Sequence, residues 1–347
     1  MPPAVFYPLT VAAVEPLTDD AAAITFDVPP DLAGAFEFRA GQSLTVRRGA
    51  ERRSYSICVP PGHKPRIGVR EVAGGAVSSW LVREARPGDV LDVQPPSGSF
   101  TLDPARAGGR HVLLAAGSGI TPVLSIAASL LMAGAEVTLI YGNRRADTVM
   151  FADEVADLKD AFPTRMRLVH VLSREAQEVG MFSGRLDAAK LRILLPATVD
   201  APAVDGWWLC GPFGMVDGAI DVLTELGVPR SRVHRELFYV EDAPPPAVEH
   251  AEQAGPGAEV TVILDGRATV VTVPPGTPIL DGAQRARADL PFACKGGVCG
   301  TCRAQLKDGE VTMRRNFALE EHELAGGYVL TCQSLPQTPT VTVDYDA

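Results

Sequence analysis

Four cysteines near the C-terminal end limit what this chain can fold into more than any other feature does. Cys294, Cys299 and Cys302 are separated by four and then two residues, and Cys332 follows after 29 more. The 347 residues contain only 6 cysteines, which is too sparse for a disulfide scaffold. Their clustering therefore indicates a metal or cluster site.

The glycines inside this cysteine loop favour an iron–sulfur cluster. Gly296, Gly297 and Gly300 permit left-handed turns and a close approach of backbone N–H groups to sulfur. Lys295 adds a positive charge beside an anionic cluster. The spacing is that of plant-type [2Fe–2S] ferredoxins, whereas structural zinc, the alternative, usually takes two short cysteine pairs. We predict that a [2Fe–2S] cluster is held by Cys294, Cys299, Cys302 and Cys332.

The length predicts two or three domains, because one domain usually takes roughly 100–200 residues. Hydrophobic residues make up 46% and charged residues 21%, which excludes disorder over most of the chain, collagen and coiled coil. A net charge of -10 argues against a nucleic-acid partner. The longest apolar stretch is too short to span a membrane, and the N-terminus lacks a signal-peptide pattern. We expect a cytoplasmic protein with no membrane partner.

The first part of the chain, residues 1–106, has the pattern of a small antiparallel β-barrel. Short strand-like segments alternate with Gly and Pro pairs, as in many all-β domains. The predicted strands are residues 23–28, 43–46, 54–59, 67–72 and 90–93.

Residues 107–240 instead alternate buried strands with helices, which predicts a doubly wound parallel α/β sheet. The predicted strands are residues 111–116, 136–141, 167–172 and 207–210. The predicted helices are a run that ends at residue 133, then residues 153–161 and 215–226.

Residues 241–257 contain three successive prolines and no apolar periodicity, so we predict a linker. The remaining residues, 258–347, form the domain with the cysteine loop. A hairpin around Asp265 and Gly266 is expected at its start, followed by a short helix over residues 279–288.

Two sequences at strand ends predict a nucleotide site. Gly117, Ser118, Gly119 and Thr121 lie between a buried strand and a helix, where glycines and a helix N-terminus suit a pyrophosphate. A turn without a ligand is the alternative. No acidic residue that would hold a ribose 2′-hydroxyl follows the second strand.

The sequence Cys210, Gly211 and Pro212 ends a later strand. Ligands of open α/β sheets bind beyond the carboxyl ends of strands, so this sequence faces the same crevice. A plain strand end is the alternative here.

The order of these motifs resembles the ferredoxin–NADP⁺ reductase superfamily joined to a C-terminal plant-type ferredoxin of β-grasp fold. The resemblance rests on the RSYS sequence that begins at Arg53, on the GAVS, GSGITP and CGP sequences and on the cysteine loop, and covers essentially the whole chain. Within it, the sequences YGNR, DLPFACKGGVCGTC and NFALEEHELAGGYVLTCQ are similar to reductase components of phenylacetyl-CoA epoxidase complexes.

The resemblance implies a role for each matching residue. Arg53 would pair with the FAD pyrophosphate, Tyr55 would stack on the isoalloxazine, and Ser56 would lie near flavin N5. The pyrophosphate would be cradled by Gly75, Ala76, Val77 and Ser78.

The resemblance also implies residues that hold the nicotinamide nucleotide. Cys210 would lie near the nicotinamide C4, and Ser173 and Arg174 would hold a 2′-phosphate. This arrangement favours NADPH, although NADH is also used in the superfamily.

The expected electron path runs from NADPH through FAD and the [2Fe–2S] cluster to a di-iron oxygenase. Nicotinamide releases two electrons together, a cluster takes one at a time, and a flavin can do both. Two other interpretations remain open at this stage. One is a reductase of the same architecture for a Rieske-type aromatic or steroid hydroxylase, and the other is a redox sensor module without turnover.

Overall fold

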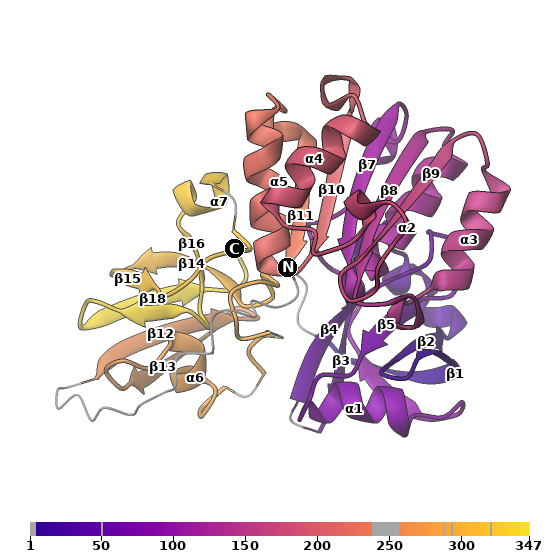
Figure 1. Cartoon of the computed structure of the whole chain (residues 1–347). Coiled ribbons are helices and arrows are strands. Elements are labelled where there is room, and N and C mark those ends of the chain that lie inside the picture. The colour runs from indigo at the N-terminus through magenta and orange to yellow at the C-terminus, as the bar shows by residue number, and fades with distance from the viewer. Residues whose placement is uncertain (1–4, 50, 238–256, 288, 293, 320) are drawn as a thin grey trace. The chain divides into compact units, whose positions relative to one another are not determined.

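The computed structural model describes residues 5–49, 51–237, 257–287, 289–292, 294–319 and 321–347 (Figure 1). The chain divides into two compact units, Tyr7–Glu51 with Tyr55–Phe238, and Tyr239–Ala347 with Met1–Phe6 and Arg52–Ser54. The predicted linker, residues 241–257, lies outside the described residues except for Gly257. No helix in the described part of the chain is long and apolar enough to cross a membrane.

The first part of the first unit is a six-stranded antiparallel sheet with the order β4-β3-β6-β1-β2-β5. A bridge between Ile57, just after β4, and Ile67 in β5 brings the two end strands together as in a barrel. Its strands are β1 (Tyr7–Thr18), β2 (Ala21–Asp27), β3 (Ser43–Arg48), β4 (Glu51–Ser56), β5 (Arg66–Arg70) and β6 (Val90–Val93).

The five predicted strands are present in this sheet, and the antiparallel prediction is confirmed. The sequence analysis missed β1 and the helix α1 (Ala76–Arg83). Strand β4 ends at Ser56 rather than at the predicted residue 59, because the chain leaves β3 there to bridge β5. Alternate residues of these strands fill the interior, among them the fully buried Leu9, Ile24 and Phe26.

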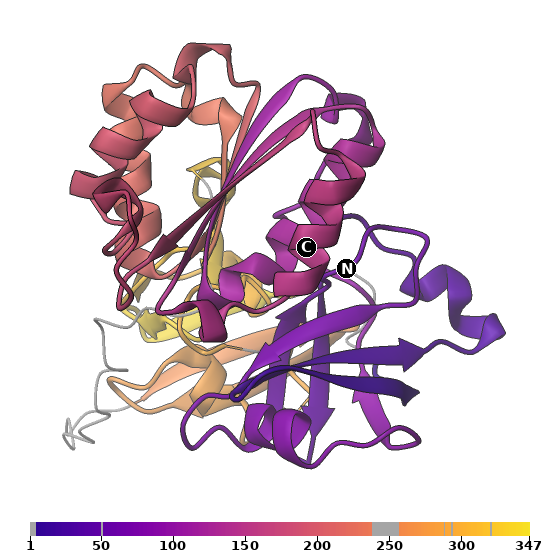
Figure 2. The same ribbon diagram turned by 45° about the vertical axis from the view of Figure 1, so that its right-hand side comes forward.

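The second part of the first unit is a five-stranded parallel sheet with the order β11-β10-β7-β8-β9 (Figure 2). Helices α4 and α5 lie on one face of this sheet, and α2 and α3 on the other. The strands are β7 (Arg110–Ala116), β8 (Glu136–Asn143), β9 (Met166–Leu172), β10 (Gly206–Gly211) and β11 (Val233–Leu237). The helices are α2 (Ile120–Met132), α3 (Ala152–Ala161), α4 (Ala188–Thr198) and α5 (Phe213–Glu225).

The parallel strands with helices on both faces confirm the predicted doubly wound α/β sheet, although the sequence analysis missed α4 and β11. The barrel and the parallel sheet share one apolar core, in which Ala23 and Phe100 pack with Val123 and Ile126 of α2. Cys58 belongs to this core. Burial raises the pKa of its thiol to about 12, so it is a small buried residue of the core.

The C-terminal domain is a mixed five-stranded sheet with the order β13-β12-β18-β14-β16, and α6 packs against it. Its elements include β12 (Ala258–Leu264), β13 (Arg267–Val273), α6 (Ile279–Ala283), β14 (Arg303–Asp308), α7 (Glu321–Ala325), β16 (Tyr328–Leu330) and β18 (Thr340–Asp344). A two-stranded pair, β15 (Val311–Met313) and β17 (Ser334–Pro336), lies beside it.

The hairpin predicted in this domain is confirmed. Asp265 and Gly266 at its turn have φ of 55° and 68°, as a two-residue turn of this kind requires. The helix predicted over residues 279–288 is too long, since α6 ends at Ala283. Further along, the chain turns so that the Arg287 guanidinium binds Asp289 at 2.8 Å.

Candidate functional site

Strand β4 presents the predicted flavin residues on both of its faces. Arg53 and Tyr55 alternate with Ser56, which is 3% exposed and points to the interior side. Arg53 is exposed and Tyr55 is half-buried, so a planar group can lie against this strand with a phosphate near the guanidinium.

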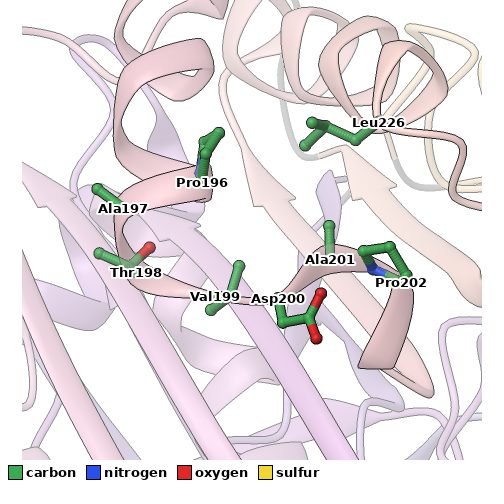
Figure 3. A pocket seen from close by; sticks show the side chains of 8 residues that line it. All are labelled: Pro196, Ala197, Thr198, Val199, Asp200, Ala201, Pro202 and Leu226. Atoms are coloured by element: carbon green, nitrogen blue, oxygen red, sulfur yellow. The ribbon is translucent and has the colours of Figure 1, made fainter.

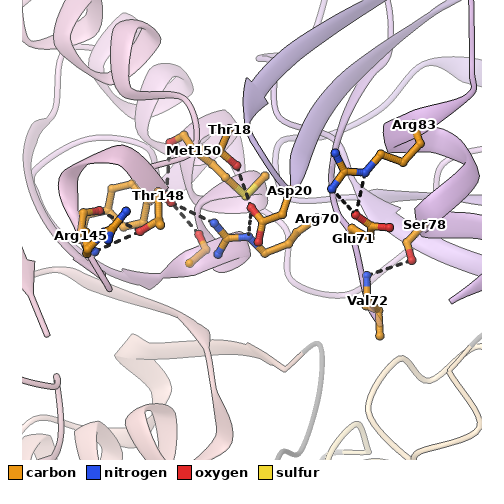
Figure 4. Close-up of polar contacts among 12 residues, drawn as sticks. Thr18, Asp20, Arg70, Glu71, Val72, Ser78, Arg83, Arg145, Thr148 and Met150 are labelled. Carbon is orange, nitrogen blue, oxygen red and sulfur yellow. Dashed lines mark hydrogen bonds and ion pairs between the residues drawn. The ribbon is translucent and has the colours of Figure 1, made fainter. Parts of the chain in front are cut away.

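The predicted GAVS sequence, Gly75 to Ser78, lies at the start of helix α1. Gly75 is its N-cap, and the Ser78 hydroxyl accepts from the Val72 amide at 3.1 Å (Figure 4). A Cβ at Gly75 would lie 2.5 Å from the Ser78 Oγ and 3.0 Å from the Val72 carbonyl oxygen, so a larger residue would displace the Ser78 hydroxyl. The amides of the first helical turn, at Ala76 and Val77, are suited to an anion because they have no partner within the helix.

The predicted nucleotide loop connects β7 to α2 as a short 3₁₀ turn, Gly117–Gly119. Gly117 has a φ of 54°, which favours glycine. The Thr121 hydroxyl donates to the Ser118 carbonyl at 3.0 Å, and the Tyr141 hydroxyl donates to the Gly117 carbonyl at 3.1 Å.

Arg70 at the end of β5 supports this loop from the barrel. Its guanidinium donates to the Thr148 carbonyl at 2.9 Å and pairs with Asp20 at 3.3 Å (Figure 4). A Cβ at Gly117 would lie 3.1 Å from the Arg70 Nη1. The barrel therefore reaches the loop through a charged side chain.

The structure brings Ser56 and Cys210 together around a residue that the sequence analysis missed. The Ser56 hydroxyl donates to the Glu236 Oε2 at 3.2 Å, across 180 positions of the chain. Cys210 on β10 is directly in register with Glu236 on β11, and neighbouring residues in register point to the same face. Burial raises the pKa of Glu236 to about 8, against the hydrogen bond from Ser56. Burial also raises the pKa of the Cys210 thiol.

Glu236 is the single carboxylate of strand β11 and precedes the buried Leu237, which was the available signal for this residue. Strands β7 and β10 end at the same edge as this group, and the loop that holds Gly119 touches Gly211 and Cys210. Pro212 then provides the N-cap of α5. A buried hydroxyl, a buried thiol and a partly buried carboxyl thus meet beside the nucleotide loop.

Ser173 and Arg174 follow β9 at the same edge of the sheet. The Ser173 amide donates to Asn143 at 2.9 Å, and the Arg174 amide donates to Arg144 at 2.8 Å. Both arginine side chains are exposed, and neither makes an ion pair or hydrogen bond with another described residue. The neighbouring Arg145 is neutralised by Asp147.

The four cysteines of the C-terminal domain form two neighbouring pairs. The Cys299 thiol, with backbone amides that include Gly296, holds the pKa of Cys294 below its usual value. The Cys302 thiol likewise lowers the pKa of Cys332. The Gly296 amide donates to the Cys294 Sγ at 3.3 Å. Thiols with N–H donors, as at Cys294 and Cys332, are the kind of ligand that a [2Fe–2S] cluster takes.

The expectation for Lys295 needs a correction. Its ammonium binds the Asp281 carboxylate at 2.8 Å and the Gln284 side chain at 2.7 Å. The positive charge beside the cysteine loop is therefore neutralised by α6 and is not directed at the sulfur atoms.

A pocket of about 520 Å³ lies away from all of these residues (Figure 3). It is lined by Pro196, Ala197, Thr198, Val199, Asp200, Ala201, Pro202 and Leu226. It lies between the ends of α4 and α5 and precedes β10, so it is at the amino end of that strand. Because ligands of such sheets bind at the carboxyl ends of strands, we do not place the site there.

Family comparisons match three parts of the chain in order. Residues 8–102 match an oxidoreductase FAD-binding domain, residues 113–221 an oxidoreductase NAD-binding domain, and residues 262–337 a 2Fe-2S iron-sulfur cluster binding domain.

Relatives resemble the chain over almost its whole length. A 1,2-phenylacetyl-CoA epoxidase subunit from Escherichia coli (strain K12) is 42% identical over 353 residues, which covers 99% of this chain and 98% of the relative. The ferredoxin reductase component of 3-ketosteroid-9-alpha-monooxygenase from Mycobacterium tuberculosis (strain ATCC 25618 / H37Rv) is 35% identical, with 97% and 95% covered.

Solved structures share the fold of this chain. Phthalate dioxygenase reductase has a TM-score of 0.63 at 25% identity and covers 98% of both chains. An intact type IV self-sufficient cytochrome P450 monooxygenase has a TM-score of 0.69 at 24% identity, which shows the fold alone. The match covers 97% of this chain and only 41% of that longer one.

Proposed function

Because this chain belongs to the family of FAD- and [2Fe–2S]-containing oxygenase reductases that includes the 1,2-phenylacetyl-CoA epoxidase component from Escherichia coli, we propose that its electron acceptor is the di-iron oxygenase of such an epoxidase. The chain is an oxidoreductase that transfers electrons from NAD(P)H through FAD and [2Fe–2S] to an oxygenase. When bound, FAD accepts two electrons together as hydride, and the cluster carries them singly. The identity of 42% over the whole chain carries the proposal.

We propose that β4 and α1 bind FAD. Arg53 pairs with the pyrophosphate, because a guanidinium suits phosphate oxygens, and Tyr55 covers one face of the ring. The amides that follow Gly75, at Ala76, Val77 and Ser78, cradle the phosphates. The N-cap conformation of Gly75 and the close Ser78 hydroxyl support this assignment.

Hydride transfer is assigned to the group of Ser56, Cys210 and Glu236. In this assignment the Ser56 hydroxyl would lie near the flavin N5 and Cys210 near the nicotinamide C4. A Glu236 carboxyl with its pKa raised to about 8 keeps its proton at neutral pH, so it bonds Ser56 without placing a negative charge beside the incoming hydride.

The dinucleotide lies along the carboxyl edge of the parallel sheet. The loop with Gly117, Ser118, Gly119 and Thr121 holds its pyrophosphate, and Gly211 and Pro212 border the nicotinamide end together with Cys210.

NADPH is the proposed electron donor. Arg174 and Arg144 are adjacent, exposed and without ion-pair partners among the described residues, so together with Ser173 they can bind a 2′-phosphate. Arg174→Ala should raise the KM for NADPH about tenfold and leave the KM for NADH within twofold, since NADH lacks this phosphate. Equal changes with both nucleotides would contradict the assignment.

We propose Cys294, Cys299, Cys302 and Cys332 as the cluster ligands. Cys302→Ser should abolish the cluster absorbance while NADPH still bleaches the flavin. No disulfide joins any of the six cysteines in the described part of the chain, which fits a reducing compartment, and we propose the cytoplasm as the location.

The partner is tested by reconstitution. The purified chain, the epoxidase component and NADPH should give phenylacetyl-CoA-dependent NADPH oxidation and an epoxide product. The second candidate partner is a 3-ketosteroid hydroxylase, because a reductase component of that type is 35% identical. Faster turnover with the ketosteroid oxygenase than with the epoxidase would replace the proposed partner and leave the reductase chemistry unchanged.

A further inference from the structure

Gln333, which directly follows Cys332, connects that cysteine to the loop with the other three. Its side chain is 6% exposed. The Nε2 donates to the Lys295 carbonyl at 2.8 Å, to the Cys332 carbonyl at 3.0 Å and to the Cys332 Sγ at 3.6 Å. An amide nitrogen has only two protons, so one N–H binds Lys295 and the other is shared by the two acceptors of Cys332.

The bond to Lys295 fixes a conformation that this residue would not favour by itself. Lys295 has a φ of 52°, which costs a residue with a Cβ roughly 1–2 kcal/mol. In this conformation its carbonyl faces Gln333, and the next amide, at Gly296, points at the Cys294 Sγ. The Gln333 amide therefore stabilises the turn that aims backbone N–H groups at sulfur.

Packing holds the same side chain under the loop. A Cβ at Gly297 would lie 3.1 Å from the Gln333 Cγ, and the Gly297 amide is among the groups that lower the pKa of Cys332. The Gln333 backbone also accepts from the Arg314 amide at 2.9 Å. The side chain thus has little freedom to leave Cys332.

Electrostatics gives this contact a consequence for electron transfer. The Lys295 ammonium is neutralised by Asp281, whereas the Gln333 amide directs a partial positive charge at the Cys332 Sγ. An N–H donor near a ligand sulfur stabilises the additional negative charge of the reduced cluster and raises its reduction potential.

We propose that Gln333 is a positioning residue that holds the cysteine loop closed and raises the reduction potential of the cluster through Cys332. This inference rests on the proposed assignment of the four cysteines as ligands. The residue makes the cluster a better acceptor of the electron that leaves the flavin.

The test compares two variants with a matched control in the full chain. Gln333→Glu keeps the shape and removes both donors, and Gln333→Met removes the donors without adding charge. The control, Gln337→Glu, makes the same chemical change at an exposed residue whose side-chain amide donates to the Leu335 carbonyl at 3.2 Å. The midpoint potential of the cluster is measured by redox titration followed by electron paramagnetic resonance.

We expect Gln333→Glu to shift the reduction equilibrium at least tenfold toward the oxidised cluster, which is about 59 mV for one electron. Gln333→Met should shift it in the same direction by a smaller factor, and Gln337→Glu should stay within threefold of the unmodified protein. Potentials of both Gln333 variants within threefold of the unmodified protein would overturn the proposal. So would an equal shift in the control, because charge alone would then explain the result.

Two further outcomes have a defined meaning. Failure of both Gln333 variants, but not of the control, to hold a cluster would leave Gln333 a purely structural role and overturn the effect on potential. Absence of a cluster signal in the unmodified protein after reconstitution with iron and sulfide would instead refute the ligand assignment on which the inference rests.

Discussion

Replacing Gly119 by alanine should push the nucleotide loop away from the end of β10, where Cys210 lies. Gly119 has φ -60° and ψ -11°, so an alanine backbone is not strained there. The constraint is space, because a Cβ would lie 2.1 Å from the Cys210 carbonyl oxygen, 2.5 Å from its carbon and 2.9 Å from the Gly211 nitrogen. All three atoms belong to the backbone of β10 and cannot rotate away.

The size of the effect follows from these distances. A carbon–oxygen contact normally starts at about 3.3 Å, so the nucleotide loop and the end of β10 must separate by roughly 1 Å. A misplacement of about 1 Å can slow a reaction about a hundredfold, which is about 2.7 kcal/mol in the barrier. We expect this loss in the rate at which NADPH reduces the flavin, measured by stopped-flow absorbance under anaerobic conditions.

Gly214→Ala provides the control. Gly214 lies in the first turn of α5, near the same crevice, and a Cβ there would meet no atom within 4 Å. Its rate should be unchanged, and both variants should retain FAD and the cluster spectrum. Flavin reduction by Gly119→Ala within threefold of the unmodified protein would show that this close contact does not position the reacting groups.

Three other substitutions test the first unit. Ser56→Ala removes the hydroxyl that bonds Glu236 and should slow flavin reduction at least tenfold with unchanged FAD content; an unchanged stopped-flow rate would contradict the assignment. Burial raises the pKa of Glu236 to about 8, so the folded protein keeps a proton that the unfolded chain loses above pH about 4.3. The contribution of this carboxyl to the free energy of unfolding is complete below that pH and is lost as the pH rises through about 8. Glu236→Gln should therefore reduce the fall of Tm between these two pH values. An equal dependence of Tm on pH in the variant and the unmodified protein would argue against a protonated carboxyl. Arg66 pairs with Glu154 at 3.0 Å and with Glu15 at 2.6 Å, and both carboxylates are partly exposed. Arg66→Met should therefore lower the free energy of unfolding, measured in urea, by about 1–2 kcal/mol. An unchanged free energy of unfolding would mean that solvent screens both ion pairs fully.

Much of the chemistry could be predicted from local sequence, because the residues that define it are close together in the chain. The cysteine spacing, the Gly-Ser-Gly turn and the Asp265–Gly266 hairpin each depend on a few neighbouring backbone angles, and glycine at those positions is a direct consequence. Four strands of the parallel sheet, β7 to β10, are likewise predominantly apolar runs. They could be recognised because both faces of such a sheet are buried.

Other elements escaped prediction because their sequences carry no clear period. Strand β1, helix α1 and the strands after the cysteine loop depend on partners elsewhere in the sheet. β18, for example, lies between β12 and β14. Such strands are stabilised by pairing and packing more than by intrinsic propensity.

The sequence by itself thus determined the cofactor classes and the order of the domains, since these follow from compact motifs. Only the tertiary structure decided how distant residues act together. Strand pairing places Glu236 against Ser56, and the turn at Lys295 places its carbonyl against Gln333. In each pair a buried polar group needs a partner, and the fold supplies it from a residue that no spacing in the sequence could identify.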